Sequence, residues 1–262
     1  MTSAYSIVAR KEIVDHFRDR RSLTSAAAHA LMGPAIVMLV SFSPKGQGQA
    51  MPDIMLGMMS VFALVSAFVG AMNIAIDVMS GERERRSLVP LLMTPVPPRD
   101  VVIGKWMAVS LFGLGALTFN VAGLVIVLAW RAPATLVAHA ALLASWAILG
   151  LAPLVLLGAS LEIFVAGLSR TMKEAGTSLT LVLFAPMIVG MFLVFFPVPD
   201  GWWSVVPMVG QQVVLDAGLR GAPAVSLHVV VLGLVTAVCA WGPLMAAARV
   251  LGRDDVAAWP TV

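Results

Sequence analysis

The sequence predicts an all-α integral membrane protein with six transmembrane helices, preceded by an N-terminal amphipathic helix at the membrane surface. Of its 262 residues, 60% are hydrophobic and 12% are charged, against about 45–50% and about 25% in ordinary soluble domains. Six stretches carry no charge, and each is longer than the ~20 residues that cross a hydrocarbon core. These features exclude a soluble enzyme, a disordered chain and a nucleic-acid-binding module. The single cysteine, Cys239, excludes an intrachain disulfide.

Residues 1–22 are too charged to enter a bilayer, but they have helical periodicity. Tyr5, Ala9, Ile13 and Phe17 recur every four residues, and charged residues occupy the opposite side. This pattern is typical of a helix that lies in the cytoplasmic interface with its aromatic side chains in the acyl boundary. A simple basic anchor on the cytoplasmic side explains the composition equally well.

The charge-free stretches define the spans. They are Ser22 to Pro44, Ile54 to Ile76, Trp106 to Trp130, Ala132 to Leu161, Ala175 to Pro199 and Gly221 to Ala248. We expect helices over about 23–43, 54–78, 103–130, 136–162, 176–197 and 224–247. Together they form one membrane domain, residues 23–248, which a cytoplasmic tail of residues 249–262 follows.

The basic residues of the connections predict the orientation, because Lys and Arg are retained on the cytoplasmic side. With the N-terminus inside, three basic residues face outside, at Lys45, Arg131 and Arg220. The other fourteen lie inside: Arg10, Lys11, Arg18, Arg20, Arg21, Arg83, Arg85, Arg86, Arg99, Lys105, Arg170, Lys173, Arg249 and Arg253. Both termini are therefore expected in the cytoplasm. Two outer connections are too short to hold a domain.

The third outer connection, residues 200–222, is longer than the others. Trp202 and Trp203 suit the headgroup level of a membrane. The apolar run that follows is too short to span, and Gln211 and Gln212 interrupt it, so a re-entrant or interfacial helix is expected. The alternative is a surface helix that only seals the outer end.

The inner connection 81–105, GERERRSLVPLLMTPVPPRDVVIGK, contains the main candidate site. Leu88, Leu91 and Leu92 have i, i+3, i+4 spacing, so a short helix would present an apolar knob rimmed by charge. Such a knob suits a partner with a hydrophobic groove, although the leucines could instead lie in lipid. The candidate partner contacts are Glu82, Arg83, Glu84, Arg85, Arg86, Ser87, Leu88, Leu91 and Leu92, with a secondary contact at Arg170, Lys173 and Glu174.

Four polar residues fall within or near the spans: Asn73, Asp77, Asn120 and Glu162. We expect the asparagines to link helices. Asp77 and Glu162 lie near inner ends, so we expect them to snorkel or to pair with loop arginines. The histidines have no ligand-like spacing, and no metal site is expected. No HExxH or GxSxG motif is present, which disfavours a membrane enzyme.

Several of these segments together carry a resemblance. KEIVDHFRDRRSL at 11–23, GERERRSLVPLLMTPV at 81–96 and the pair Gly104–Lys105 resemble the membrane subunit of ABC-2 type ABC transporters, and within that class the NatB-like and NosY-like permeases. PMVGQQVVL at 207–215 is similar to the outer helix of the family. The chain departs from the family pattern at Ser87, usually threonine, and Val89, usually glutamate. The resemblance extends over essentially the whole chain.

The resemblance implies a transmembrane domain like that of type V exporters, in a prokaryotic plasma membrane. It implies pairing with a second permease copy or a paralogue and with separate ATPase subunits, which hold the ATP and Mg²⁺. No cofactor is expected on this chain, which has no GxxxxGK[ST] motif. The expected cargo is Na⁺ or an amphipathic, lipid-like molecule. The alternative function is an ion- or proton-coupled secondary transporter without an ATPase.

Overall fold

The computed structural model describes residues 3–42, 53–85, 87, 95–131, 140–196, 201–220 and 227–252. In these ranges every regular element is helical and no strand occurs. Six helical runs are long and apolar enough to cross a membrane, which confirms the predicted number. They are Ser22–Ser41, Leu56–Glu84, Pro98–Trp130, Ala147–Leu168, Met172–Phe195 and Leu227–Leu251.

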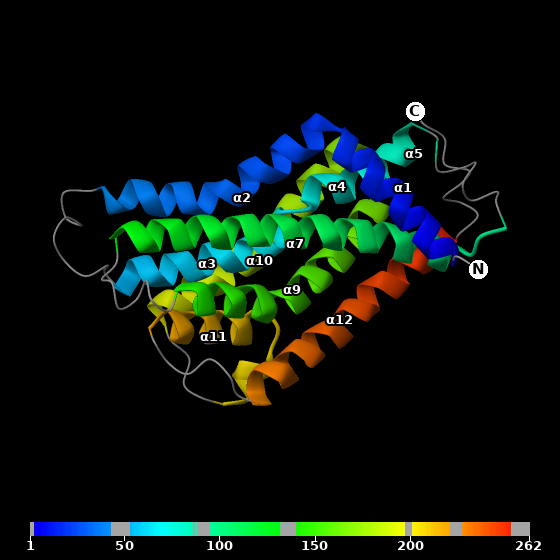
Figure 1. The fold of residues 1–262 in the computed structure, drawn as a ribbon. Helices are drawn as coiled ribbons and strands as arrows, with labels where there is room; N and C mark the ends of the chain where they lie inside the picture. The colour runs from blue at the N-terminus through cyan, green and yellow to red at the C-terminus, as the bar shows by residue number, and fades with distance from the viewer. Residues whose placement is uncertain are drawn as a thin grey trace.

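The first two helices meet at a sharp elbow at the top of Figure 1. Helix α1 covers Ala4–Arg18, and α2 covers Arg20–Ser41. Asp19 between them has an extended backbone, and its Oδ2 accepts hydrogen bonds from the Ser22 amide (3.1 Å) and hydroxyl (2.6 Å). A carboxylate in this position caps the free amides at the start of α2, so Asp19 fixes the place where the chain turns.

Helix α1 packs along the first part of α7 (Pro98–Arg131). The side chains that α1 buries are Val8, Ala9, Glu12 and His16, a face that only partly overlaps the stripe predicted to enter lipid. Of that stripe, Ala9 is buried, whereas Tyr5 and Phe17 remain exposed. Gly104 permits the close approach, because a Cβ there would lie 2.7 Å from the Tyr5 carbonyl oxygen and from the Val8 Cβ.

The second run is interrupted, although the sequence predicts one helix over 54–78. Helix α3 (Asp53–Val69) is separated from α4 (Met72–Ile76) by a turn at Gly70 and Ala71. A π-helical turn, η2 (Asp77–Gly81), and the short α5 (Glu82–Glu84) follow without a gap. The run therefore continues into the segment expected as loop, and turns of this kind often occur at functional positions.

The remaining spans lie close to the predicted ranges. They are α7, α9 (Ala140–Leu168), α10 (Met172–Phe195) and α12 (Leu227–Leu251). Helix α9 packs against both α7 and α12, and the core consists of two apolar clusters among these helices and α3. The starts of α1 and α7 and the end of α12 lie at the same end of the bundle (Figure 1), which we call the α1 end.

Residues 201–220, expected in the outer connection, form a 3₁₀ turn, η3 (Trp202–Val205), and helix α11 (Val209–Leu219). The Trp202 and Trp203 rings stack with centroids 3.7 Å apart. Helix α11 folds back against α3 and α9 (Figure 1). Its two buried glutamines donate to other spans, Gln211 to Thr236 Oγ1 (2.8 Å) and Gln212 to Ser60 Oγ (2.7 Å). These contacts attach α11 to the interior of the bundle.

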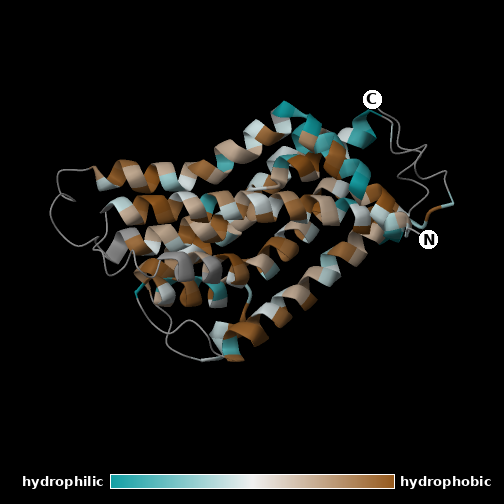
Figure 2. Ribbon diagram, viewed as in Figure 1, coloured by the Kyte–Doolittle hydropathy of each residue, from teal (hydrophilic) through white to brown (hydrophobic). Residues whose placement is uncertain are grey.

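Apolar residues dominate the long helices, and hydrophilic ones gather at the α1 end (Figure 2). Large hydrophobic side chains also face outward along the spans. Leu39 is 72% exposed, Phe119 68% and Leu227 80%. An outer surface of this composition requires an apolar solvent, as expected of an integral membrane protein.

Candidate functional site: a buried lysine where the loops converge

Lys105 lies at the centre of the α1 end and is completely buried. Its ammonium donates to Glu82 Oε2 (2.6 Å), Glu12 Oε1 (3.0 Å) and the Val78 carbonyl oxygen (2.8 Å). An ammonium has three donors, so all three are satisfied. The acceptors come from α1, η2 and α5, and the donor comes from α7. One side chain thus joins four elements.

We call Lys105, Glu12, Glu82 and Lys11 the lysine hub. Lys11 Nζ completes it by contacting Glu82 Oε1 (2.9 Å) and Glu12 Oε1 (3.1 Å). Glu12 is 3% exposed and Glu82 7%. Two cations and two carboxylates leave the lysine hub neutral, which offsets the large desolvation cost of burying charge.

The side chain of Lys11 is about half exposed. Burial lowers the pKa of Lys11, but the hydrogen bond to Glu82 and the attraction of Glu12 and Glu82 outweigh it. The net effect raises the pKa of Lys11 above its ordinary value of 10.5. Lys11 therefore keeps its charge throughout the physiological range and holds the outer edge of the lysine hub.

Arg83, the residue after Glu82, turns to the end of α9. Its Nη1 donates to the Ser169 carbonyl oxygen and its Nη2 to the Gly167 carbonyl oxygen, both at 2.7 Å. The last carbonyls of a helix have no partner within the helix and carry partial negative charge. The forked guanidinium satisfies two of them and places a cation where the helix dipole favours it.

Glu84 contacts the start of the next helix. Its Oε2 accepts the amide of Met172 (3.0 Å), the first residue of α10. Thr171 caps the same helix by accepting the Glu174 amide (3.2 Å), and Glu174 in turn accepts the Arg170 amide (2.8 Å). Carboxylates are favourable near a helix N-terminus. Glu84 therefore ties the first inner connection to the second.

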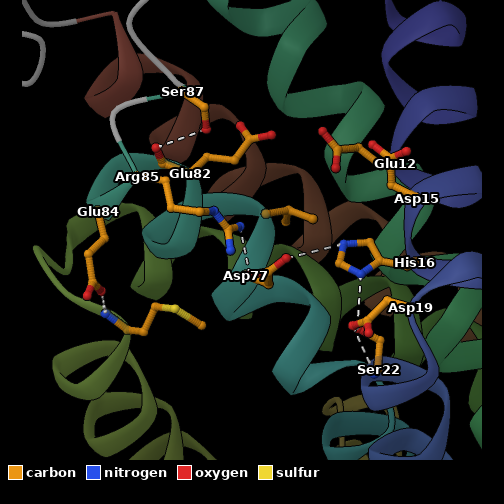
Figure 3. Close-up of polar contacts among 12 residues, drawn as sticks. Glu12, Asp15, His16, Asp19, Ser22, Asp77, Glu82, Glu84, Arg85 and Ser87 are labelled. Carbon is orange, nitrogen blue, oxygen red and sulfur yellow. Dashed lines mark hydrogen bonds and ion pairs between the residues drawn. The ribbon is translucent and has the colours of Figure 1, made fainter.

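A polar cleft lies between α1 and the η2–α5 segment, and Figure 3 shows side chains from both sides of it, among them Glu12 and Glu82 of the lysine hub. The cleft has a volume of about 640 Å³. The Asp77 carboxylate accepts from Arg85 Nη2 (2.8 Å) and lies 4.0 Å from Nε2 of buried His16. The Nδ1 atom of His16 lies 3.2 Å from the Ser22 hydroxyl. The cleft thus separates the elbow from the first inner connection.

The structure describes some of the candidate partner contacts, and most of those it describes are exposed. Ser87 is exposed, and its hydroxyl donates to the Glu82 carbonyl oxygen (3.2 Å). Glu84, Arg85 and the second-connection residues Arg170, Lys173 and Glu174 are also exposed, whereas Glu82 is buried. The remaining candidates, Arg86, Leu88, Leu91 and Leu92, lie outside the described residues. Contact with a partner stays a prediction for all of them.

Three of the four polar span residues make the expected contacts. Asn73 Nδ2 donates to Ser25 Oγ and Asn120 Nδ2 to the Ala30 carbonyl oxygen (2.8 Å), so each links its helix to α2. Asp77 pairs with a loop arginine, Arg85. Glu162 does not, because it is 2% exposed and its Oε1 has no hydrogen-bond partner in the described part of the chain. The expected snorkelling or pairing of Glu162 is wrong, since its place on α9 points into the helix packing.

Glu12 and His16 are interior groups that the sequence pattern did not predict. A signal was present, because they lie four residues apart, each directly before a member of the Tyr5–Phe17 stripe, and so belong to the same helical side. The sequence marked Lys105 as one of the basic residues expected inside and as part of the Gly104–Lys105 pair, and gave no sign that it is buried. Within the described ranges, no group of three or more His, Cys, Asp and Glu residues could hold a metal ion.

A family model described as ABC-2 family transporter protein matches residues 6–200. The chain belongs to the ABC-2 transporter family. The matched range contains the whole lysine hub and both inner connections. This ABC-2 protein is 34% identical to the ABC transporter permease protein NatB of Bacillus subtilis (strain 168) over 161 residues. That alignment covers 60% of this chain and 41% of NatB, so the chain matches less than half of that relative's length.

Family membership and fold agree on the coarse function. The ABC-2 chain is a multi-pass membrane protein and a membrane component of an ABC transporter. The resemblance stated from the sequence is thereby confirmed. The contacts of Glu82, Arg83 and Glu84 now give its Glu-Arg-Glu run a structural role that sequence alone did not indicate, because each side chain holds a different element.

Proposed function

We propose that this chain is the permease subunit of an ATP-driven exporter in a prokaryotic plasma membrane, with both termini in the cytoplasm. A separate ATPase subunit would dock on the connection 81–105, and a second permease copy or a paralogue would complete the path. ATP and Mg²⁺ would bind to the ATPase. Family membership and the excess of basic residues in the connections at the α1 end support this proposal.

The observation that carries the proposal is the divergence of three consecutive side chains. Glu82 holds α1 and α7 through Lys105, Arg83 holds the end of α9, and Glu84 holds the start of α10. A force applied to the following residues would therefore act on four helices together. Rigid-body tilting of packed helices is a common way to convert such a force into an opening.

In the proposed cycle, the ATPase subunits close on ATP and pull the Leu88–Leu92 segment. Glu82 and Arg83 pass the displacement to α7 and α9, and the spans tilt to open an outward path. The work comes from the difference in ATPase affinity between the two conformations of the permease. The cargo, Na⁺ or an amphipathic molecule, is distinguished by comparing Na⁺ flux with lipid-analogue flux in proteoliposomes that contain the complete transporter.

The test is co-purification from native membranes in mild detergent. Wild-type permease should bring down a P-loop ATPase, and the double variant Leu91→Asp/Leu92→Asp should lose it while remaining in the membrane. The matched variant Leu91→Met/Leu92→Met keeps the apolar surface and should retain it. Normal recovery with the aspartates would refute docking at this segment.

If wild-type permease brings down no ATPase under conditions that preserve other ABC complexes, the whole proposal fails. The ion-coupled secondary transporter then becomes the better hypothesis, because Glu162 provides a buried carboxyl group without a partner on Oε1 among the described residues. In that case Glu162→Gln should abolish coupled transport in proteoliposomes.

A further inference from the structure

An apolar groove runs along the outer surface between the elbow and the middle of α7. It has a volume of about 350 Å³, and Phe17, Ala27, Leu111, Gly115 and Phe119 are among its lining residues. Phe17, Leu111 and Phe119 are 57%, 46% and 68% exposed. The groove therefore opens away from the core, on the surface that faces lipid.

Both ends of the groove are closed by contacts between helices. At the elbow, the rings of Phe17 and Phe112 pack with centroids 4.9 Å apart. At the other end, the hydrogen bond from Asn120 to the Ala30 carbonyl oxygen (2.8 Å) draws α7 and α2 together. From Arg20, the first residue of α2, to Ala30 the helix rises about 15 Å, half of a hydrocarbon core about 30 Å thick. The groove thus has the depth of one leaflet.

Two arginines adjoin, in the sequence, residues that line the elbow end of the groove. Arg18 follows Phe17 directly, and Arg20 begins α2 three residues before Leu23, which also lines the groove. Both are exposed, and no carboxylate of the described residues pairs with either guanidinium. Asp19 between them is turned to the Ser22 amide and hydroxyl. A leaflet-deep apolar groove with two exposed cations next to its elbow end in the sequence matches the shape and charge of one anionic lipid.

We propose that this groove binds an acyl chain of an anionic glycerophospholipid and that Arg18 and Arg20 hold its phosphate. Arginine suits this role because its fork donates two hydrogen bonds to phosphate oxygens. The lipid would lie on Phe17, on the helix that supplies Glu12 to the lysine hub, and would hold α1 against α7. The site does not depend on which leaflet α1 faces.

The test uses the delipidated full-length protein and native mass spectrometry. Phosphatidylglycerol and phosphatidylcholine with identical acyl chains are titrated separately. Wild type should retain one phosphatidylglycerol with about tenfold tighter binding than phosphatidylcholine, because each basic residue near an anionic lipid contributes several-fold in affinity. The double variant Arg18→Gln/Arg20→Gln should lose this preference, whereas Arg249→Gln, at an exposed arginine in the last turn of α12, should keep it.

A second substitution tests the groove itself. A Cβ on Gly115 meets no atom within 4 Å, so Gly115→Leu fills the groove without a clash at its base. Gly115→Leu should weaken the binding of both lipids about tenfold by excluding the chain. Gly242→Leu, at another glycine with open space, should change neither lipid affinity. If Gly115→Leu does not fold, Ala27→Leu fills the same groove from α2.

Three results would overturn the proposal. Wild type could bind both lipids equally, which would reduce the arginines to general membrane anchors. The arginine variant could keep the full preference. Gly115→Leu could alter the oligomeric state in detergent while lipid retention stays unchanged, which would make the groove an interface with a second copy.

Discussion

Replacing Lys105 by methionine tests whether the lysine hub holds the α1 end together. Methionine has a similar shape and leaves little cavity, so the change removes mainly the ammonium and its bonds to Glu12, Glu82 and the Val78 carbonyl. The lysine hub then passes from neutral to a net charge of −1. Losing one partner of a buried ion pair costs about 3–5 kcal/mol, because the other charge stays buried.

The assay is thermal unfolding of the purified permease in one detergent, followed by size-exclusion chromatography of the surviving fraction. A loss of this size lowers Tm by about 10 °C for a chain of this length. The control is Lys173→Met, the same chemical change at an exposed lysine near the start of α10. A surface substitution of this kind changes stability by about 0.5 kcal/mol or less.

A double variant separates the charge imbalance from the loss of packing. Lys105→Met/Glu12→Gln restores neutrality and leaves the pair of Lys11 with Glu82, at 2.9 Å, in place. It should recover about 1–3 kcal/mol of the loss, since groups in contact are energetically coupled by this amount. A Tm of Lys105→Met equal to that of wild type, or a double variant less stable than Lys105→Met, would refute the role of the lysine hub in stability.

Three further predictions are measured by the same unfolding assay. Arg83→Met should lower the free energy of unfolding by about 1–3 kcal/mol, because it leaves two carbonyls at the end of α9 without a charged donor. Arg83→Lys should lose less of this stability than Arg83→Met. Wild-type stability in Arg83→Met would contradict the capping role. Glu162→Gln should leave stability unchanged or raise it, because a neutral amide replaces a buried carboxyl, and a marked fall would reveal a partner for the carboxylate. The stability that the Lys11 charge contributes should be fully present below the unfolded-state pKa and should be lost as pH rises through the raised folded-state pKa. The difference in stability between wild type and Lys11→Met should therefore disappear at alkaline pH. A difference that does not change with pH would assign Lys11 a packing role instead.

The spans could be predicted because hydrophobicity of this extent leaves few alternatives. The interruption at Gly70 and Ala71 could not, since both residues are common in transmembrane helices and their immediate neighbours, Val69 and Met72, are apolar. The extension through η2 and α5 was also missed. A charged residue such as Glu82 is typical of a loop. Here its carboxylate is paired with Lys105 inside the bundle, and this pairing offsets the free-energy cost of removing the charge from water.

The sequence marked the connection 81–105 as a partner contact, which stays a prediction, and did not indicate the contacts that its residues make within the chain. The structure places Glu82, Arg83 and Glu84 at the junction of the helices. The pairing of Lys105 with Glu12 joins residues 93 positions apart. No periodicity within one segment encodes such a distance, so the two groups could be recognised only once α1 had been placed against α7.

The contacts of residues 82–84 also determine where the chain can change in length. Successive residues of an α-helix point about 100° apart, and this rotation directs Glu82, Arg83 and Glu84 to three different neighbours. Deleting or inserting one residue between Asp77 and Glu82 would rotate all three away from their neighbours at once.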